Sequence, residues 1–534
     1  MSEMLVLGDE ALALGAIDAG LAIAYGYPGT PSTEIIEYIQ RYVKKNDSEI
    51  IARWCSNEKT AYEGSVGVSY AGKRTLVTMK HVGLNVAADA FVNSALLEIN
   101  GGLVLAVADD PGMHSSQNEQ DSRYFADFAK IMCLEPRNHQ EAYDMTIEAF
   151  RLSELFHIPV MVKLVTRLSH SRSVITRSKS LPISDFGTAV DKLKWMTLPA
   201  LSRGNWKNLL EQQHEFEAYS KDSKFNTLKI NKNYKKFGVI TTGLGCNYYF
   251  ENLDDLSTEP SHLHIAVYPV PVDLIKELAA NVNSLIVIEE GYPFVEKMLN
   301  GIIQDTLPVH GKLDGSLPAY GELNPDNVRK SLGLTPRENQ GGSTASLPGR
   351  PPQLCAGCPH TDSFHALNVA LEGFDESIVT GDIGCYALGA LPPHSAIEAL
   401  LCMGASIGMA RGASEAGRKN VVASIGDGTF LHSGVTALID AASTNTNMTL
   451  MIMDNSTTAM TGMQDTIMTS PMIKNIVLAC GVDSKHVREL KVLSKNHDEN
   501  TKIMKEEIEY NGLSVIITLR ECIHVIGKVR GELK

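Results

Sequence analysis

The sequence predicts an α/β protein made of three doubly wound, Rossmann-like domains, each built on a parallel sheet. Short apolar, β-branched runs alternate with longer helix-like runs along most of the chain, and two polar stretches interrupt the alternation. In the last third, a buried strand ends in a Gly-Asp-Gly turn at residues 426–428 and a helix follows it. Crossover helices cover both faces of a parallel sheet, so this alternation predicts sheets that are buried on both sides.

The first predicted domain spans residues 1–175. Its strand-like runs are 50–52, 74–79, 102–108 and 159–164, and helix-like runs include 33–45 and 57–70. The first ten residues lack the basic stretch and cleavage site of a signal peptide. We therefore interpret them as the first strand of a cytoplasmic protein.

The rest of the chain divides into two further blocks separated by linkers. Residues 176–235 are polar and predict a linker with short helices, and residues 306–350 are rich in Gly and Pro and predict a second linker. Between them, residues 236–305 form a second α/β unit with strand-like runs at 237–243, 263–268 and 284–290. The last unit, 351–534, contains the Gly-Asp-Gly turn.

Composition limits the classes of partner. The 534 residues include 44% hydrophobic residues, which supports large buried cores, and the net charge is −14 with a pI near 5.6. This charge disfavours nucleic acid and anionic membrane as partners. No 18-residue uncharged apolar run occurs, so no membrane span is expected.

The ends of two strands carry the most informative residues. Asp427 follows one apolar strand, and Asn455 follows the next after a gap of 26 residues from Gly428. Parallel strands bring their carboxyl ends to one edge, where a carboxylate, a side-chain amide and a backbone carbonyl form a hard oxygen site suited to Mg²⁺. Flanking glycines let backbone amides approach a diphosphate.

The pattern resembles the thiamine diphosphate (TPP) motif, whose members here are Gly426, Asp427, Gly428, Thr429, Asn455 and Thr457. In that motif Asp427, Asn455 and the Thr457 carbonyl hold the metal.

TPP chemistry also needs a carboxylic acid that hydrogen-bonds ring atom N1′ of the cofactor's aminopyrimidine. Glu58 follows the strand-like run 50–52 and opens a helix, so it is the candidate. An acid on a first helical turn is also ordinary helix-start chemistry. The downstream TPP motif favours the catalytic interpretation.

Nine cysteines at irregular spacing argue against a disulfide framework. Cys355 and Cys358 form the one Cys-x-x-Cys pair, and no closely spaced run of cysteines predicts an iron–sulfur cluster in this chain. A half zinc site would need a second ligand pair, a c-type haem site would need His where Pro359 stands, and a redox disulfide would need a thioredoxin-like context.

Several long stretches resemble the α subunit of indolepyruvate ferredoxin oxidoreductases, within the 2-oxoacid:ferredoxin oxidoreductase superfamily. They lie at 27–35, 57–59, 78–87, 108–121, 355–360, 380–392 and 454–462. The resemblance implies a pyrimidine-binding domain at 1–175, a transketolase C-terminal-like domain at 236–305 and a diphosphate-binding domain at 351–534. It also implies a homodimer core.

The resemblance implies roles for individual residues. Glu58 would be the N1′ glutamate, and Thr30, otherwise explained by turn chemistry, would face the thiazolium and the substrate carboxylate. The residues that would line the thiazolium pocket are Cys358, His360, Gly384, Cys385 and Tyr386, which makes the Cys-x-x-Cys pair a cofactor-pocket turn. Lys80, His81, His114 and Glu119 lie in loops that would face the site, with His81 and His114 as candidates for the substrate pocket.

Two departures from the family limit what the resemblance implies. The chain ends at Lys534 without the family's C-terminal ferredoxin-like domain, so we expect a separate β subunit or ferredoxin to carry the iron–sulfur clusters. Residues 463–471 differ from the family's His-containing segment, which predicts a more apolar pocket and leaves the 2-oxoacid undefined.

The sequence therefore predicts a TPP- and Mg²⁺-dependent oxidoreductase subunit that decarboxylates an aryl or bulky 2-oxoacid, with CoA as the possible acyl acceptor. A non-oxidative TPP-dependent decarboxylase or carboligase is the alternative, because both reactions share every step up to loss of CO₂. A regulatory subunit with a vestigial site is disfavoured by the intact Glu58, Asp427 and Asn455.

Overall fold

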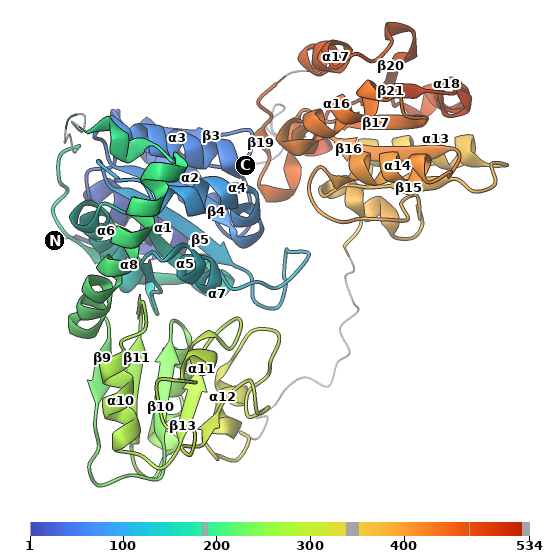
Figure 1. Ribbon diagram of the computed structural model, residues 1–534. Helices are drawn as coiled ribbons and strands as arrows, with labels where there is room; N and C mark the ends of the chain where they lie inside the picture. The colour runs from blue at the N-terminus through green and yellow to red at the C-terminus, as the bar shows by residue number, and fades with distance from the viewer. Residues whose placement is uncertain (1, 184–186, 188–190, 338–351, 469, 526–534) are drawn as a thin grey trace. The chain divides into compact units, whose positions relative to one another are not determined.

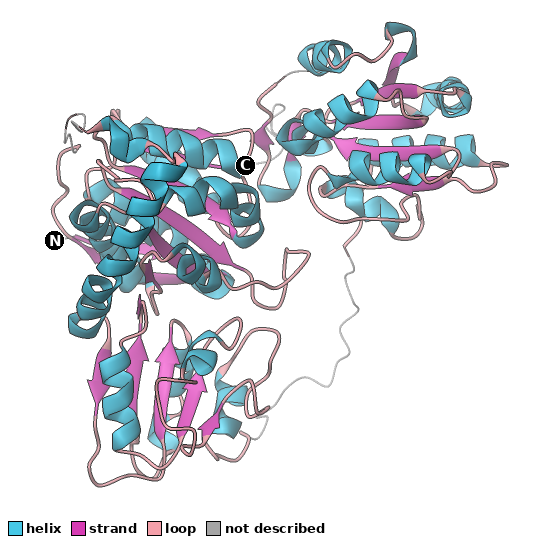
Figure 2. Ribbon diagram, in the orientation of Figure 1, coloured by secondary structure: helices cyan, strands magenta, loops and turns pink. Residues whose placement is uncertain are grey.

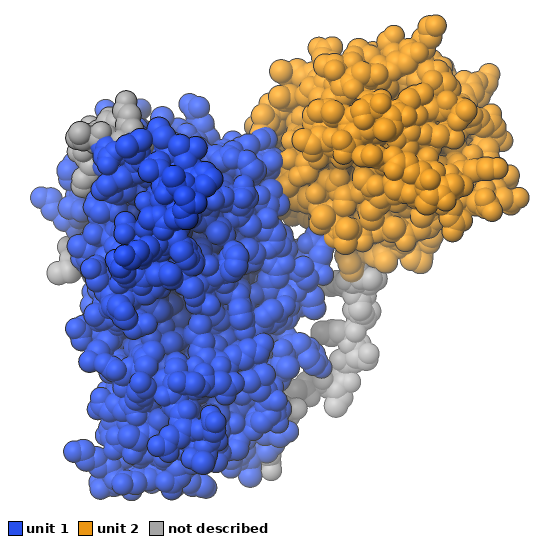
Figure 3. Space-filling model, in the orientation of Figure 1, with its two compact units in different colours: residues 1–342 blue, residues 343–534 orange. Residues whose placement is uncertain are grey.

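The computed structural model describes residues 2–183, 187, 191–337, 352–468 and 470–525. The chain divides into two compact units, residues 1–342 and 343–534 (Figure 3). The boundary falls within the second predicted linker, whose Gly-Gly-Ser-Thr residues at 341–344 lie outside the described residues. Three sheets that are mainly parallel, flanked by helices, confirm the predicted α/β class (Figures 1 and 2).

The first sheet of unit 1 has seven strands in the order β12-β6-β7-β5-β4-β2-β3. Every residue of β4, β5 and β7 is buried, as expected for central strands covered on both faces. The strands are β2 (Ile23–Gly26), β3 (Ile51–Trp54), β4 (Thr75–Lys80), β5 (Leu103–Asp109), β6 (Cys133–Leu134), β7 (Val160–Val165) and β12 (Val267–Tyr268). The helices are α1 (Gly8–Asp18), α2 (Thr33–Asn46), α3 (Glu58–Tyr70), α4 (His81–Ser94), α5 (Arg123–Ala129), α6 (His139–Phe156) and α7 (Thr166–His170).

The predicted first strand is β1 (Ser2–Leu7). It does not join the parallel sheet but pairs antiparallel with β8 (Arg172–Arg177) in a separate two-stranded sheet.

The second sheet of unit 1 has five strands in the order β14-β13-β10-β11-β9. They are β9 (Thr227–Lys229), β10 (Gly238–Thr242), β11 (Ser261–Ile265), β13 (Leu285–Ile288) and β14 (Val309–His310). Its helices are α9 (Gly245–Phe250), α10 (Val272–Ala280), α11 (Phe294–Met298) and α12 (Pro325–Ser331). Both β14 and α12 lie beyond residue 305, in the stretch where a linker was predicted.

The single strand predicted at 263–268 is wrong, because the chain there contributes to two sheets. β11 stays in the second sheet, whereas β12 pairs antiparallel with β6 at the edge of the first. The Asn226 side-chain oxygen accepts hydrogen bonds from the amides of Ala266 (2.7 Å) and Val267 (3.0 Å). This side chain fixes the point where the chain leaves one sheet for the other.

Residues 176–235 contain a longer element than the short helices predicted there. Helix α8 (Pro199–Asp222) has 24 residues, and its Leu209 and Phe216 are buried. Most of its other side chains are polar, which is why the stretch resembled a linker in sequence. Buried residues two turns apart are enough to attach a helix to a domain surface.

Unit 2 holds a five-stranded, all-parallel sheet in the order β15-β16-β17-β21-β20. The strands are β15 (Ile378–Thr380), β16 (Val421–Gly426), β17 (Met448–Asp454), β20 (Val487–Lys491) and β21 (Leu513–Leu519). Alternate residues of β16 and β17 enter two separate core clusters. One cluster includes α14 (Ala405–Glu415), α16 (Val435–Ser443) and α17 (Ser470–Ala479), and the other includes α13 (Pro359–Leu371) and α18 (His497–Glu509). Helices therefore cover both faces.

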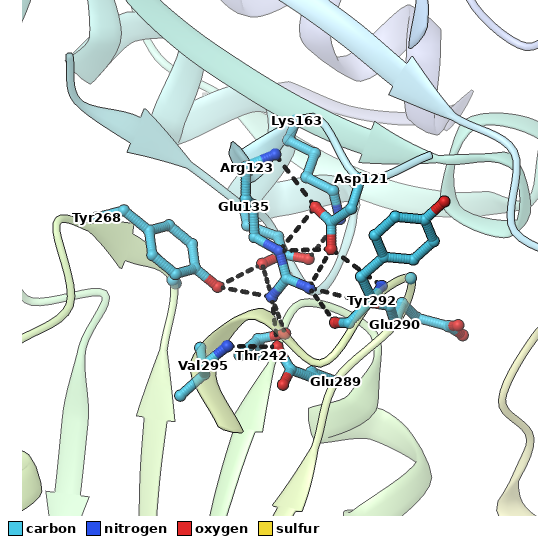
Figure 4. A network of polar contacts seen from close by, with 12 residues as sticks. Asp121, Arg123, Glu135, Lys163, Thr242, Tyr268, Glu289, Glu290, Tyr292 and Val295 are labelled. Atoms are coloured by element: carbon cyan, nitrogen blue, oxygen red, sulfur yellow. Dashed lines mark hydrogen bonds and ion pairs between the residues drawn. The ribbon is translucent and has the colours of Figure 1, made fainter. Parts of the chain in front are cut away.

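A buried ionic network joins the two sheets of unit 1 (Figure 4). The fully buried guanidinium of Arg123, the first residue of α5, pairs with Asp121 and lies 2.9 Å from a carboxylate oxygen of Glu289, just after β13. Lys163 on β7 pairs with Glu135 at 2.9 Å. No described helix is long and apolar enough to span a membrane.

Candidate functional site

The carboxyl ends of β16 and β17 bring two carboxylates together in unit 2. Asp427 opens the short helix α15 (Asp427–Thr429) and Asp454 ends β17, and each is only 4% exposed. Asp427 accepts hydrogen bonds from the amides of Gly428 (2.8 Å) and Ser456 (3.0 Å), and Asp454 accepts from the same Ser456 amide at 3.1 Å. The two carboxylates therefore share one donor.

This pair of carboxylates fits a divalent cation. Burial raises the pKa of Asp427, and the neighbouring Asp454 carboxylate raises it further. In the described part of the chain, Asp454 Oδ2 is buried without a hydrogen-bond partner. Adjacent buried carboxylates with an unused oxygen lack positive charge, which Mg²⁺ would supply. Asp454 was not among the predicted ligands, although it immediately precedes Asn455.

Asn455 and Thr457 follow directly on the same edge. The Asn455 side-chain oxygen accepts from the Thr457 amide at 3.1 Å, and its nitrogen lies 3.3 Å from His360 Nε2. Thr457 begins β18 (Thr457–Thr458), pairs with β19 (Gln464–Asp465) and donates its hydroxyl to the Gln464 carbonyl at 3.0 Å. The structure thus gathers Asp427, Asn455 and Thr457, and their role as metal ligands stays a prediction. β19 places part of the divergent segment 463–471 directly beside Thr457; residue 469 lies outside the described residues.

Tyr386 explains two of the glycines at this edge. A Cβ on Gly384 or on Gly426 would lie 2.4 Å from the Tyr386 ring, which leaves no room for a side chain at either position. The Ile383 carbonyl accepts the hydroxyls of Tyr386 and Thr429, both at 2.9 Å. The ring therefore holds the turns after β15 and β16 together.

His360 lies in the first turn of α13 and is 2% exposed. Burial lowers the pKa of the His360 imidazole to about 4, so the ring is neutral at physiological pH. Because the Asn455 amide nitrogen can only donate, His360 Nε2 is the acceptor and Nδ1 carries the proton. The ring stands edge-on to Tyr386 at a centroid distance of 5.9 Å.

Four cysteines lie in the same region as these residues. The Cys358 amide donates to the Cys355 carbonyl at 3.0 Å, and Cys355 Sγ lies 3.4 Å from His524 Nε2, two residues after Cys522. Burial raises the pKa of Cys385 to about 11, and the nearby thiols of Cys358, Cys522 and Cys355 contribute to the rise.

The family resemblance placed Cys358 and Cys385 in one pocket. Spacing in the sequence identified only the Cys355–Cys358 pair, because Cys385 and Cys522 are far away in the chain. Both cysteines follow the carboxyl ends of strands, β15 and β21, so their proximity could be predicted only if the strand order were known. As they stand, no three His, Cys, Asp or Glu side chains of the described residues converge closely enough to hold a metal ion.

In unit 1, the corresponding sheet edge carries Glu58. It is the first residue of α3 and is 5% exposed, and the preceding Asn57 caps the helix by accepting from the Thr60 amide at 2.9 Å. A Cβ added to Gly83 would lie 2.5 Å from Glu58 Oε1. The carboxyl group therefore rests against the first turn of α4, at the end of β4.

Lys80 is the last residue of β4, and His81 is the first residue of α4. The Lys80 ammonium donates to the Ser115 carbonyl at 3.0 Å. Burial lowers the pKa of Lys80 to about 8, although the carboxylates of Asp110 and Glu58 act in the opposite direction. His81 Nε2 donates to the Asn118 carbonyl at 3.2 Å, while Nδ1 is buried without a partner in the described segments.

The remaining candidates contact the loop at 110–121 or belong to it, and only Thr30 lies near Glu58. Thr30 accepts the Ser115 hydroxyl through its carbonyl at 3.2 Å, so it lies near Lys80 and Glu58. The His114 side chain is 55% exposed and lies 3.2 Å from Glu322, and Glu119 accepts the amides of Gly112 and Gly321. His114 and Glu119 therefore hold the loop against residues 321–322.

A surface pocket of about 440 Å³ lies elsewhere in unit 1. It is lined by residues 95–98, by residues 156–158 and by one side of α8. None of the predicted site residues line it, and it contains no catalytic grouping of side chains.

Comparison with known proteins matches one TPP-related family in each unit. Residues 14–185 match the family described as "Pyruvate flavodoxin/ferredoxin oxidoreductase, thiamine diP-bdg", and residues 382–518 match "Thiamine pyrophosphate enzyme, C-terminal TPP binding domain". Indolepyruvate oxidoreductase subunit IorA of Archaeoglobus fulgidus is 35% identical over 99% of this chain and 88% of the relative. The subunit of the same name from Pyrococcus horikoshii is 34% identical over 100% of this chain and 88% of the relative.

A solved structure agrees on the fold alone. It is a 2-oxoglutarate:ferredoxin oxidoreductase from Magnetococcus marinus, with a TM-score of 0.51 and 16% identity, and it covers 62% of this chain and 65% of its own. Identity is about one third over nearly the whole chain, two TPP-binding families match, and candidate residues lie at the expected sheet edge of each unit. The chain therefore belongs to the family of the indolepyruvate oxidoreductase subunit IorA, among the TPP-dependent 2-oxoacid:ferredoxin oxidoreductases.

Proposed function

We propose that this protein is the α subunit of a TPP- and Mg²⁺-dependent enzyme that decarboxylates an arylpyruvate of the indolepyruvate type and passes the electrons to ferredoxin, with CoA as the acyl acceptor. The observation that carries the proposal is the buried pair Asp427 and Asp454, with its unpartnered oxygen, at the edge where Asn455 and Thr457 also lie. The names of the relatives supply the substrate class.

Each half of the site has its own task. Asp427, Asn455 and the Thr457 carbonyl would hold Mg²⁺ on the diphosphate, with Asp454 adding negative charge. Glu58 would hold a proton against N1′ of the pyrimidine, and the neutral His360 would orient Asn455. When bound, TPP supplies the acidic carbon that adds to the substrate carbonyl and accepts the electron pair left by CO₂.

The electrons need an acceptor close to the site. Our sequence-based expectation is that a separate β subunit or ferredoxin carries the clusters. The location of Cys355, Cys358, Cys385 and Cys522 in one region of unit 2 supports a first acceptor within this chain, because four thiols are the usual donor set of an iron–sulfur cluster. We therefore propose that these thiols hold a cluster, and that a partner carries the electrons onward.

The test uses the full chain reconstituted anaerobically with iron and sulfide. We expect about four irons per chain, a brown chromophore and reduction of methyl viologen with indolepyruvate, all lost in Cys385→Ala and Cys522→Ser. Cys480→Ser is the control, because Cys480 follows α17 and packs against the core cluster on that side of the sheet. A colourless protein in which only a cluster-bearing partner restores dye reduction would leave the separate-partner scheme in place.

A non-oxidative decarboxylase or carboligase is the second candidate, favoured by the imperfect convergence of the thiols. It would release an aldehyde or an acyloin from the 2-oxoacid without reducing any dye. Accumulation of either product, with no dye reduction in any reconstituted state, would replace the oxidoreductase proposal.

A further inference from the structure

We propose that Lys80 binds the carboxylate of the 2-oxoacid substrate and so selects for 2-oxoacids over ketones. The inference rests on the proposed function and adds to it the residue that recognises the charged end of the substrate.

Lys80 is held rigidly beside the predicted catalytic residues. A Cβ on Gly29 would lie 3.2 Å from both Cγ and Cδ of Lys80, so the lysine stem packs under the turn that contains Thr30. The ammonium donates to the Ser115 carbonyl at 3.0 Å, and the Ser115 hydroxyl in turn donates to the Thr30 carbonyl at 3.2 Å. The turn and the loop together fix the position of the charge.

The ammonium has donors to spare. Lys80 is 9% exposed, and among the described residues it makes this one hydrogen bond and no ion pair within 4 Å. An ammonium has three donors, so two remain for a ligand. A buried cation that keeps its donors unused at a sheet edge is suited to an anionic ligand, and the substrate class carries a carboxylate.

The nearby carboxylates do not occupy this role. Asp110 is already bound by the amide of Ser115 and by the hydroxyls of Ser116 and Thr166. Glu58 rests against Gly83, and its charge raises the pKa of Lys80. Both carboxylates favour the charged form of the lysine, against the effect of burial, without taking the place of a ligand.

The other basic side chains at this edge already have partners. Arg167 pairs with Glu322 at 2.8 Å, and His114 faces the same glutamate at 3.2 Å. His81 uses Nε2 on the Asn118 carbonyl. Lys80 is therefore the buried cation of the described residues that lies beside Glu58 and Thr30 with free donors.

The experiment compares two ligands that differ in the carboxylate. Phenylpyruvate is the substrate probe and is measured by CO₂ release. Phenylacetone, which replaces the carboxylate with a methyl group, is tested as a competitive inhibitor. With the TPP-loaded full chain, Lys80→Met should raise KM for phenylpyruvate about 10- to 100-fold, the effect of losing one charge-assisted contact. The inhibition constant of phenylacetone should change less than about twofold, and Lys80→Arg should recover part of the loss.

Controls separate this role from a structural one. Lys59→Met, an exposed lysine on α3 paired with Glu63, should change neither constant. Equal losses for both ligands in Lys80→Met, loss of TPP binding in both Lys80 variants, or an unchanged KM for phenylpyruvate would overturn the assignment. A wild-type chain that binds TPP but releases CO₂ from no 2-oxoacid would instead overturn the proposed function, and the assignment with it.

Discussion

Two like-charged side chains lie side by side in the core of unit 2, and that arrangement needs a reason. Asp427 and Asp454 are both 4% exposed, and they share the Ser456 amide. Repulsion between them is relieved either by a proton, which the raised pKa of Asp427 indicates in the metal-free protein, or by a cation. A bound Mg²⁺ would displace that proton.

Asp427→Ala should therefore weaken binding of TPP and Mg²⁺ by more than about 100-fold, since a direct ligand matters more than the outer residues that tune a site. Isothermal titration calorimetry of the full chain measures this. Asp440→Ala, which removes an exposed carboxylate of the same unit, should leave affinity unchanged. Undiminished affinity in Asp427→Ala would exclude the aspartate as a ligand.

Glu58→Gln should retain TPP but slow exchange of its C2 proton by about 10²- to 10⁴-fold, the usual range for a lost general acid–base group. Hydrogen–deuterium exchange followed by NMR after acid quench reports the rate. Glu63→Gln changes a half-exposed glutamate of the same helix and should exchange at the wild-type rate. Equal rates in both variants would remove Glu58 from the mechanism.

The site residues that could be predicted from sequence are those that belong to a local sequence motif. Asp427, Asn455 and Glu58 each follow a recognisable strand, so their edge position could be predicted. Asp454 and Cys522 could not, because their proximity depends on register: Gly426 pairs with Met453, and Asp454 pairs with Leu519. Lys80 was noted only as a loop residue, since its burial depends on the distant turn at Gly29.

At the scale of elements, the contact between α3 and α4 positions Glu58. Gly83→Ala would put a methyl group within 2.5 Å of the present Glu58 carboxylate and push it aside. We expect folding to be unharmed, because alanine favours a helix over glycine by about 1 kcal/mol. Exchange of the TPP C2 proton should nevertheless slow markedly.

Gly67→Ala is the matched control, because a Cβ at that position of α3 meets no atom within 4 Å. It should raise the melting temperature slightly and leave exchange unchanged. Slow exchange in both variants, or in neither, would mean that the first turn of α4 does not set the carboxylate's position.

The elements themselves were predictable where hydrophobic periodicity is strong. The helix at Thr33–Asn46 and the strands β4, β5, β16 and β17 lie where the sequence placed them, within one or two residues. The strand at 263–268 was misassigned because two apolar strands, β11 and β12, are separated by one residue. Periodicity cannot reveal that adjacent residues belong to different sheets.

At the scale of the whole molecule, the Arg123 network couples the seven-stranded and five-stranded sheets of unit 1. Arg123→Met would leave Asp121 and Glu289 buried without their cation, which should cost about 3–5 kcal/mol of unfolding free energy at pH 7. Urea unfolding measures the loss in the transition that reports on unit 1. Arg151→Met, which breaks a surface pair on α6, should cost less than about 1 kcal/mol.

The pH dependence follows from Asp121. Burial alone would raise its pKa, but Arg123 and Lys163 lower it to about 2. A depressed pKa contributes stability above the unfolded value near 4 that is lost as pH falls toward 2. Asp121's share of the difference between wild type and Arg123→Met should therefore shrink over that interval, and a difference that grows instead would contradict the pairing.

Each unit carries one half of the proposed site, Glu58 in unit 1 and Asp427 in unit 2, and the family resemblance implies a homodimer. If one TPP site uses Glu58 of one subunit and Asp427 of the other, two inactive variants should complement each other. In a mixed dimer of Glu58→Gln and Asp427→Ala, one site would receive both mutations and the other would receive neither. Random mixing should then restore about a quarter of wild-type activity, because half of the dimers are mixed and each has one intact site.

Coexpression of two differently tagged Glu58→Gln chains is the control and should restore none. Complete inactivity of purified mixed dimers would mean that each site is formed within a single chain.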